Sequence, residues 1–355
     1  MFEQEKADMR PFSRRTFVKG LISLTFTLGG LGCAPFQSTS APTTPKHIRL
    51  GTTLLTYRRH TGRVNTVSWQ GTQIASGSAD STVQIWEATT GASRLTYRNH
   101  TEEVTIAAWS PDGRQIVSVG TEPSVQVWNA TTGKHLLNFT GQADQVTDVS
   151  WSPDSTRIAS ASQEGDSVQI WEAATGRILL NNYRLQSSPR TAQWSSDSRY
   201  IASASDNGYV LILDATTGRT VYILRSNSMP ARATRWSPDG TRIACAHADG
   251  MIRVWDATRG SPLLAYRAHT DYGSSGRDGA DEGFLTLDVA WSPNGKYLAS
   301  SGADGTVRVW DASTGTGIFT YHGHTALVYQ SAWSPDGIRI ASGSDDKTVQ
   351  ICQAA

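Results

Sequence analysis

Short runs of apolar and β-branched residues, separated by turn-forming residues, recur along almost the whole chain. Residues 285–315 show the pattern best: L-T-L-D-V-A-W, K-Y-L-A-S-S-G and V-R-V-W are divided by S-P-N-G and A-D-G-T. Val, Leu, Tyr and Trp fit a pleated sheet, while Pro-Asn-Gly and Asp-Gly supply the backbone angles that tight turns need. The pattern therefore predicts three short strands in this stretch.

The same unit occurs seven times. Trp310 ends the third predicted strand of one unit, and its counterparts follow at intervals of 42, 43, 42, 42, 55 and 42 residues; they are Trp86, Trp128, Trp171, Leu213, Trp255 and Cys352. Seven further tryptophans, from Trp69 to Trp333, end the first strand of each unit, so all 12 tryptophans fall on repeat positions. A period near 42 residues predicts a repeat architecture with one small sheet per unit.

This period, with four short strands per unit, resembles the WD-repeat β-propeller family over residues 50–355. The resemblance rests on a His that opens the unit, an Asp in the turn between the second and third strands, and a closing Trp-Asp or Trp-Glu. It implies an all-β, seven-bladed propeller. It also implies a buried network of His, Ser or Thr, Asp and Trp; the complete sets are His60, Ser76, Asp80 and Trp86 in unit one and His269, Ser300, Asp304 and Trp310 in unit six.

The other five units depart from this network. Unit two has Glu122 in place of the Asp, unit seven has Cys352 in place of the Trp, and unit three has Gln142 in place of the His. Units four and five keep fewer partners; the replacements there are Leu185, Asn207, Leu213, Asn227 and Cys245. Because a buried polar group without a partner costs about 1–3 kcal/mol, we expect units four and five to be the softer blades.

The two ends of the repeat region are predicted to meet in one blade. Residues 50–58, L-G-T-T-L-L-T-Y-R, match the fourth strands of other units, such as S-R-L-T-Y-R at 93–98. Unit seven stops after its third strand, at Cys352. We therefore expect the N-terminal strand to complete the last blade and close the ring, which removes an open sheet edge.

Residues 1–33 resemble a bacterial twin-arginine export signal, whose pattern is S-R-R-x-F-L-K. The matching residues are Ser13, Arg14, Arg15, Phe17 and Lys19, and Val18 is the one departure. The apolar run that follows has about 12 residues, too few for an ordinary membrane-spanning helix. The resemblance implies that the twin-arginine translocase is a partner during export.

Gly30-Leu31-Gly32-Cys33 resembles the lipobox of bacterial lipoproteins, in which the Cys is acylated, although Gly30 stands where that family prefers Leu. A Ser, Thr and Pro-rich stretch follows, so residues 34–49 are predicted to be a flexible linker. We expect Cys33 to tether the exported protein to the outer face of the cytoplasmic membrane. Ordinary cleavage and an uncleaved anchor are the alternatives.

Composition adds little positive information about function. The chain has 32 basic and 31 acidic residues, and without residues 1–33 it has 27 and 28, so it shows no nucleic-acid or membrane-surface footprint. Cys33, Cys245 and Cys352 form no disulfide framework. The sequence has no G-x-S-x-G, H-E-x-x-H or G-x-x-x-x-G-K motif. We therefore predict no catalytic residues, metal or cofactor.

The interval of 55 residues contains a 13-residue insertion, in T-D-Y-G-S-S-G-R-D-G-A-D-E-G-F. By register it joins the fourth strand of one blade to the first of the next, which in the resembling family opens on the top face. Long loops on rigid scaffolds often carry specificity, so we predict a recognition loop; its candidates are Asp271, Tyr272, Arg277, Asp278 and Asp281. The alternative is a tolerated surface insertion, and D-G-A-D-E-G lacks the ligand spacing of a calcium loop.

The residues after each His position vary between units although the framework does not. They combine charges with an aromatic ring, which suits a protein or peptide partner; they are Arg63, Glu102, Glu103, Asp144, Arg190, Arg232 and Tyr329. Strand positions expected to line the channel carry mainly Thr, Ser, Ala and Val. We expect a non-catalytic scaffold that binds a protein or peptide on its top face. The alternative is a propeller that binds or processes a small molecule or glycan at the channel mouth.

Overall fold

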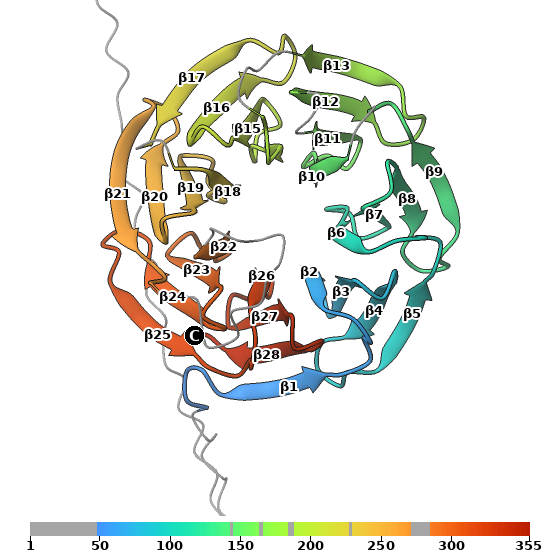
Figure 1. Cartoon of the computed structure of the whole chain (residues 1–355), viewed down its shortest axis with the longest axis vertical. Coiled ribbons are helices and arrows are strands. Elements are labelled where there is room, and N and C mark those ends of the chain that lie inside the picture. Colours follow the sequence, from blue (N-terminus) through green and yellow to red (C-terminus); the bar gives the residue numbers. More distant parts are fainter. Residues whose placement is uncertain (1–47, 143–144, 163–165, 184–187, 227–228, 271–284) are drawn as a thin grey trace, which may run out of the picture. The chain divides into compact units, whose positions relative to one another are not determined.

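A ring of small sheets dominates the structure. The computed structural model describes residues 48–355 except 143–144, 163–165, 184–187, 227–228 and 271–284. In these residues the chain forms 28 β-strands and no helix, arranged as seven four-stranded antiparallel sheets around a central axis (Figure 1). The prediction of an all-β, seven-bladed propeller is confirmed. Within this part of the chain, no helix could cross a membrane.

Each blade has an inner strand next to the axis, two middle strands and an outer strand. Blades 1 to 4 consist of β2 (Val64–Gln70), β3 (Gln73–Ser78), β4 (Val83–Glu87) and β5 (Ser93–Tyr97); β6 (Val104–Trp109), β7 (Gln115–Gly120), β8 (Val125–Asn129) and β9 (His135–Phe139); β10 (Val146–Trp151), β11 (Arg157–Ser162), β12 (Ser167–Glu172) and β13 (Ile178–Tyr183); β14 (Gln193–Trp194), β15 (Tyr200–Ala204), β16 (Tyr209–Asp214) and β17 (Thr220–Arg225).

Blades 5 and 6 follow the same order, and blade 7 takes its outer strand from the N-terminal side of the ring. Their strands are β18 (Ala231–Trp236), β19 (Arg242–His247), β20 (Met251–Asp256) and β21 (Ser261–Arg267); β22 (Thr286–Trp291), β23 (Tyr297–Gly302), β24 (Val307–Asp311) and β25 (Gly317–Tyr321); β26 (Val328–Trp333), β27 (Arg339–Ser344), β28 (Val349–Gln353) and β1 (Thr53–Tyr57).

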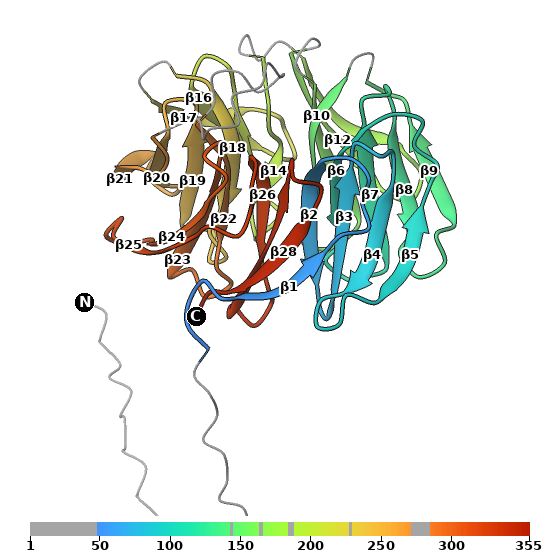
Figure 2. The ribbon, with the colours of Figure 1, turned by 60° about the horizontal axis from the view of Figure 1, so that its bottom comes forward.

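The inner strands of all blades begin on one face of the ring, which we call the top face, and end on the bottom face. Figure 2 shows the strands crossing the ring between these two faces. Turns of the S-P-D-G type lie on the bottom face: at 110–113, Ser110 Oγ donates to Asp112 Oδ1 (2.6 Å) and Gly113 has a φ of 70°. In blades 3 and 4 a serine takes the glycine position with φ near 60°, at Ser155 and Ser198. Positive φ is costly for a residue with a Cβ, so the repeated fold imposes this turn.

Strand β1 closes the ring, as predicted. It pairs antiparallel with β28, with Tyr57 opposite Val349 and Thr53 opposite Cys352. Figure 1 shows β1 along the outer side of β28. Blade 7 is therefore assembled from both ends of the repeat region.

The hydrogen bonds at this junction reproduce a turn that is continuous in the other blades. Gly51 N donates to Gln353 O (2.8 Å), as Gly91 N donates to Glu87 O (2.8 Å) in blade 1. Gly51 also keeps the positive φ of this turn, 74° against 68° at Gly91. The chain break thus falls inside a turn whose geometry is retained.

The hydrophobic cores lie between neighbouring blades. One core joins Ala75, Val83 and Ile85 of blade 1 to residues of blade 2, namely Val104, Trp109, Ile116 and Trp128. At each of three interfaces an outer-strand aromatic ring stacks on a tryptophan of the next blade with centroids 4.2–4.3 Å apart; the pairs are Tyr57 with Trp86, Tyr97 with Trp128, and Phe139 with Trp171. Packing between blades fixes their order around the axis.

Candidate functional site

Blade 1 contains a buried polar network around Ser76. The Ser76 hydroxyl lies 2.8 Å from His60 Nε2 and accepts a hydrogen bond from Trp86 Nε1 (3.2 Å). His60 Nδ1 lies 2.8 Å from Asp80 Oδ2, and the His60 side chain is fully buried. These four residues connect three strands and the loop before β2.

Blade 6 repeats this arrangement. His269 Nδ1 is 3.0 Å from both Asp304 oxygens, His269 Nε2 is 3.0 Å from Ser300 Oγ, and Trp310 Nε1 donates to the same hydroxyl (3.0 Å). Burial alone would raise the pKa of the Asp304 carboxyl. Hydrogen bonds from His269 and Thr306 outweigh burial and lower that pKa to about 2. The carboxylate therefore stays ionised and holds the histidine.

Blades 2 and 7 each keep the network with one replacement. In blade 2, Glu122 takes the place of Asp and bonds to His100, although its Oε2 atom has no partner. In blade 7, His324 lies 2.8 Å from both Asp346 and Ser342, while Cys352 occupies the tryptophan position. A longer acid or a smaller apolar residue is thus accommodated at one position without loss of the histidine.

Blade 3 lacks several partners. Gln142 stands where the other blades have His, and neither of its side-chain polar atoms has a hydrogen bond although the residue is buried. Phe139 replaces the tyrosine that donates to a Gln in blades 1, 2 and 7, and the Oε1 atom of Gln169 is left without a partner. Greater softness of blades 4 and 5 stays a prediction, and blade 3 joins them as a blade without a complete network.

Blade 5 contains a buried histidine that the repeat pattern did not assign. His247 ends β19, two residues after Cys245, and its Nδ1 atom lies 3.3 Å from both Ser226 Oγ and Met229 O. Burial lowers the pKa of His247 to about 4, so the ring is neutral at pH 7. A shift of two residues along a strand keeps a side chain on the same face of the sheet, and this is the signal that could have found it.

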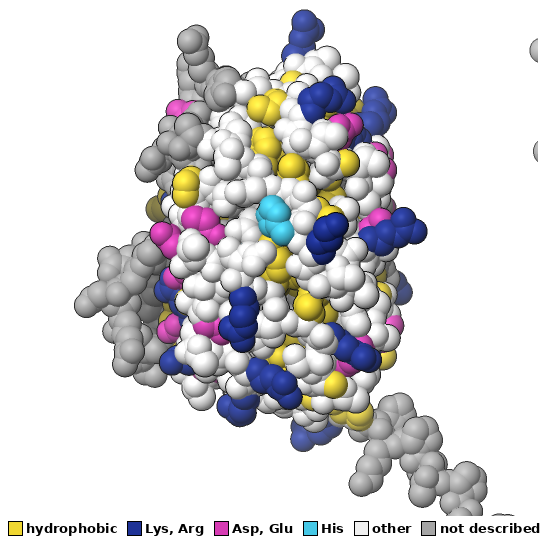
Figure 3. Space-filling model, turned by 90° about the vertical axis from the view of Figure 1, so that its right-hand side faces the viewer, with side chains coloured by type: hydrophobic (Ala, Val, Ile, Leu, Met, Phe, Trp, Pro, Cys, Tyr) yellow, Lys and Arg dark blue, Asp and Glu magenta, His cyan; other side chains and the backbone are white. Residues whose placement is uncertain are grey.

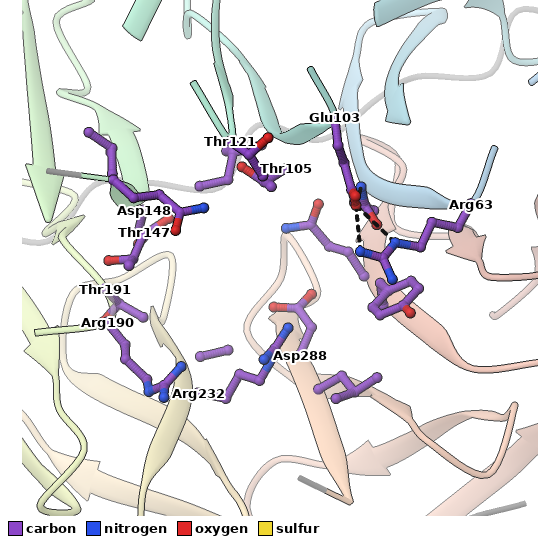
Figure 4. Close-up of a pocket in the computed structure, with 18 of the residues that line it drawn as sticks. Arg63, Glu103, Thr105, Thr121, Thr147, Asp148, Arg190, Thr191, Arg232 and Asp288 are labelled. Carbon is purple, nitrogen blue, oxygen red and sulfur yellow. Dashed lines mark hydrogen bonds and ion pairs between the residues drawn. The ribbon is translucent and has the colours of Figure 1, made fainter. Parts of the chain in front are cut away.

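The main cavity of the propeller opens at the top end of the axis and has a volume of about 390 Å³ (Figure 4). Inner strands of all seven blades, or the loops before them, contribute lining residues. Five predicted partner-binding residues meet there: Arg63, Glu103, Arg190, Arg232 and Tyr329. The other five lie outside the described residues: Asp144, Asp271, Tyr272, Arg277 and Asp278.

One side of the cavity joins blades 1, 2 and 7 through Arg63. Arg63 Nε donates to Glu103 Oε1 (2.8 Å), and Asn65 Nδ2 donates to the same oxygen (2.7 Å). The Arg63 guanidinium also lies 5.6 Å from the centroid of the Tyr329 ring. Figure 4 shows Arg63 and Glu103 facing each other at the cavity wall.

Two buried aspartates line the deeper part of the cavity. Asp288 Oδ1 accepts a hydrogen bond from Arg235 Nη2 (3.0 Å), and Asp148 Oδ2 accepts from Ala192 N (2.9 Å) and Gln193 Nε2 (2.7 Å). Burial raises the pKa of both carboxyls, and the nearby charge of Arg235 opposes this shift. Each aspartate also joins two neighbouring blades.

The expectation that the channel wall carries mainly small and hydroxyl-bearing residues is wrong, since Asp148, Asp288 and Arg235 line the cavity. The physical reason is a β-bulge near the start of inner strands, for example between Val146 and Asp148. A bulge re-aims side chains, and consecutive residues such as 147 and 148, or 287 and 288, both line the cavity. Strict alternation assigns one of each pair to the opposite face.

The outer wall of the ring offers no comparable site among the described residues. Large apolar side chains are exposed on several outer strands, including Leu136, Ile178 and Leu263. Figure 3 shows apolar side chains on one side of the ring interspersed with Lys and Arg. Exposed apolar residues scattered in this way are normal for a protein surface. The described residues also contain no group of three potential metal ligands among His, Cys, Asp and Glu.

Comparison with protein families identifies the repeat. The WD40 model, described as WD domain, G-beta repeat, matches seven segments: residues 51–87, 91–129, 133–172, 183–214, 218–256, 282–311 and 315–352. No curated protein matches the sequence significantly. The first segment runs from the closing strand β1 through the third strand of blade 1, so each match spans a blade interface. Because the seven segments cover well over half of the sequence, the chain belongs to the WD40 repeat family.

Proposed function

We propose that this protein is an exported scaffold that binds a protein or peptide in the top-face cavity without catalysing a reaction. Propellers of the WD40 family commonly bind protein partners and typically do not act as catalysts. The observation that carries the proposal is the cavity itself, where side chains that differ from blade to blade meet at the end of the axis. Framework residues such as His60 and Trp86 lie elsewhere, in the packed blades.

The proposed location rests on sequence alone, because Arg14, Arg15 and Cys33 lie outside the described residues. A twin-arginine signal would take the protein through the twin-arginine translocase, and acylation of Cys33 would tether it to the outer face of the cytoplasmic membrane. Ring closure by β1 favours folding before export, since an unclosed ring exposes sheet edges.

Cross-linked pull-down from membranes, read by mass spectrometry, tests the binding role. The cavity variant is Arg63→Ala with Tyr329→Ala, and the control is Arg94→Ala, whose side chain is exposed on outer strand β5. We expect partners that the intact chain and the control recover and the cavity variant loses. A second variant without residues 272–284 tests the predicted recognition loop. Recovery of identical partners by all forms would contradict binding at the cavity.

Membrane fractionation tests the location. We expect Arg14→Lys with Arg15→Lys to leave the protein in the cytoplasm, and Cys33→Ser to release exported protein from the membrane fraction. Labelling of the intact chain with a fatty acid, absent from the Cys33→Ser variant, would identify lipidation. Unchanged fractionation of the Cys33→Ser variant would contradict the tether.

The cavity also supports a second candidate, the binding of a small molecule or glycan at the channel mouth. Its volume of about 390 Å³ falls in the range of small-ligand pockets, about 300–1,000 Å³. Asp148 and Asp288 provide buried carboxyls on the wall. A thermal-shift screen with amino acids and small sugars separates the candidates. A ligand that stabilises the intact chain but not an Asp148→Asn variant would favour the small-molecule function.

A further inference from the structure

The polar side chains of the cavity are not mixed at random but form arcs around the axis. Blades 1 to 3 contribute amide and hydroxyl groups, including Asn65, Thr105 and Thr147. Figure 4 shows Thr105 and Thr121 on one side of the cavity, with Arg190 and Arg232 on the opposite side. Neutral groups that donate and accept hydrogen bonds suit the backbone of a peptide, which carries both kinds of group.

Blades 4 and 5 contribute a basic arc. Arg190 stands next to Thr191 on the inner edge of blade 4, and Arg232 and Arg235 come from strand β18 of blade 5. Arg190 Nε donates to Asp206, which comes from the loop between β15 and β16. A guanidinium has five N–H donors in a rigid fork, so pairing with one carboxylate does not exhaust its donors.

Blades 6 and 7 contribute an apolar arc. Leu287 and Tyr329 line the cavity there, and Ala233 lies at the junction with the basic arc. Leu287 begins the same bulged segment of β22 that carries Asp288. The apolar arc gives the cavity a surface for an uncharged side chain beside the basic arc.

The carboxyl groups of the lining already have partners within the wall. Arg63 and Asn65 bind Glu103, and Arg235 binds Asp288. The backbone of Ala192 and the amide of Gln193 bind Asp148, whose carboxyl has a pKa raised by burial. The described lining contains four guanidinium groups against these three carboxyls.

We propose that the cavity binds a carboxylate group of the peptide partner, with Arg190 and Arg232 as its donors. The inference rests on the proposed function and specifies the partner's chemistry. The carboxylate lies on the basic arc, the adjoining peptide backbone lies along the amide and hydroxyl arc, and a neighbouring apolar side chain packs on Leu287 and Tyr329. The group comes either from an acidic side chain or from a C-terminus, since both present the same two oxygens to a guanidinium.

Peptide libraries of defined charge test this inference with the full chain. Four pools of fluorescent heptapeptides have uncharged random flanks. Three are amidated and carry a central Glu, Gln or Lys, and the fourth carries Gln and a free C-terminal carboxylate. By fluorescence anisotropy we expect the Glu pool or the free-acid pool to bind about 10- to 100-fold tighter than the amidated Gln pool. The pool that wins identifies the source of the carboxylate.

Variants assign the preference to the basic arc. Arg190→Gln with Arg232→Gln is expected to abolish it, and Arg190→Lys with Arg232→Lys to keep part of it, because Lys retains the charge but not the fork. The matched control is Arg94→Gln with Arg177→Gln, two exposed arginines of the outer side. Melting temperatures check folding. If the Gln variant fails to fold, the Lys variant decides, and an undiminished preference in it contradicts the arginine fork.

The outcomes separate this inference from the proposed function. Equal binding of the pools, or a preference for Lys, overturns the carboxylate inference but leaves a peptide-binding cavity. A preference that survives loss of both arginines overturns their role. If no pool binds while membrane pull-down recovers a cavity-dependent protein, the inference fails and the scaffold stands. If both experiments fail, the proposed function fails as well.

Discussion

Blades 1 and 3 share four strands and a buried Trp–Ser pair, but they differ in what surrounds that pair. In blade 1, Ser76 contacts both Trp86 and His60, and Tyr57 donates to Gln84 Oε1 (2.8 Å). Blade 1 therefore has a polar network in which the shared serine has two ring partners.

In blade 3, Ser160 accepts a hydrogen bond from Trp171 (3.1 Å), while Gln142 and Phe139 occupy the positions of the histidine and the tyrosine. Both blades nevertheless have the same strand order, and the aromatic ring still stacks on the tryptophan. Packing and strand pairing are thus sufficient to define a blade, and the histidine network adds stability and specificity to it.

The distribution of complete blades around the ring adds to this lesson. Blades 6, 7, 1 and 2, which flank the closing strand, keep the buried histidine in its repeat position. Blades 3, 4 and 5 lie together and contribute Asp148, Arg190, Arg232 and Arg235 to the cavity. The framework is least regular where the charged side chains of the cavity are concentrated, as is common when local rules are broken near functional sites.

The largest effect is expected from removal of a whole strand, which breaks the comparison by opening the ring. Deletion of residues 47–58 takes away β1 and the stacking of Tyr57 on Trp86. We expect a loss of more than about 5 kcal/mol and aggregation through the exposed edge of β28. Calorimetry and light scattering measure both effects. Deletion of residues 36–45 is the control, and an unchanged melting curve for the β1 deletion would contradict ring closure as a source of stability.

A matched pair of substitutions tests the difference between the two blades directly. Ser76→Ala leaves both His60 Nε2 and Trp86 Nε1 without their hydroxyl partner, whereas Ser160→Ala leaves Trp171 alone. We expect losses of about 3 and about 1 kcal/mol, respectively, because each orphaned buried group costs about 1–3 kcal/mol. Urea unfolding measures both. Equal losses would show that the histidine contributes nothing to blade 1.

Acid should act on the complete blades first. The pKa of Asp304 and that of Asp346 are each lowered to about 2, because hydrogen bonds from His269 and His324 outweigh burial. An unfolded aspartate has a pKa near about 3.9, so each group contributes about 2.5 kcal/mol above pH 4 that is lost as the pH falls toward 2. Unfolding free energies measured from pH 6 to 2 should follow this slope, and Asp304→Asn should flatten it.

The cavity aspartate has the opposite sign. Burial raises the pKa of Asp148, so its contribution favours folding below the unfolded pKa and is lost as the pH rises through the folded pKa. Asp148→Asn keeps an oxygen that can accept from Ala192 and Gln193. This variant should therefore steepen the acid loss of stability. An unchanged slope for both Asp304→Asn and Asp148→Asn would contradict these assignments.

The fold could be predicted from sequence because its determinants are local and repeated. Turn residues, strand composition and the 42-residue period each recur seven times, so an irregular unit is identified by its neighbours. The match of residues 50–58 to other outer strands was enough to predict that β1 closes blade 7. No long-range information was required for these conclusions.

The site was only partly predictable. Arg63, Arg190 and Tyr329 were found because they follow the histidine position, and the fold brings that position to the axis. Asp148 and Asp288 were missed, since a β-bulge turns two consecutive residues toward the cavity and sequence alternation does not reveal a bulge. Where the backbone departs from regular pleating, the pattern of residue types no longer indicates direction.

The smallest expected effect sharpens the comparison by restoring one partner to blade 3. Phe139→Tyr would place a hydroxyl beside Gln169 Oε1, which has no partner, as Tyr97 does for Gln126 (2.8 Å) in blade 2. Gly141, close to the end of the Phe139 ring, has a counterpart in Gly323 beside the hydroxyl of Tyr321, so the site accommodates a tyrosine. We expect a gain of about 1 kcal/mol, the net value of one hydrogen bond.

Tyr97→Phe in blade 2 is the reverse change and should lose a similar amount, because it removes the donor of Gln126 Oε1. Thermal unfolding of the two variants and of the double variant measures the gain, the loss and their sum. The two sites lie at different blade interfaces, so the effects should add. A loss of stability in Phe139→Tyr would mean that blade 3 has adapted its packing to the missing hydroxyl. Its incomplete network would then be a settled alternative and not a defect that one atom repairs.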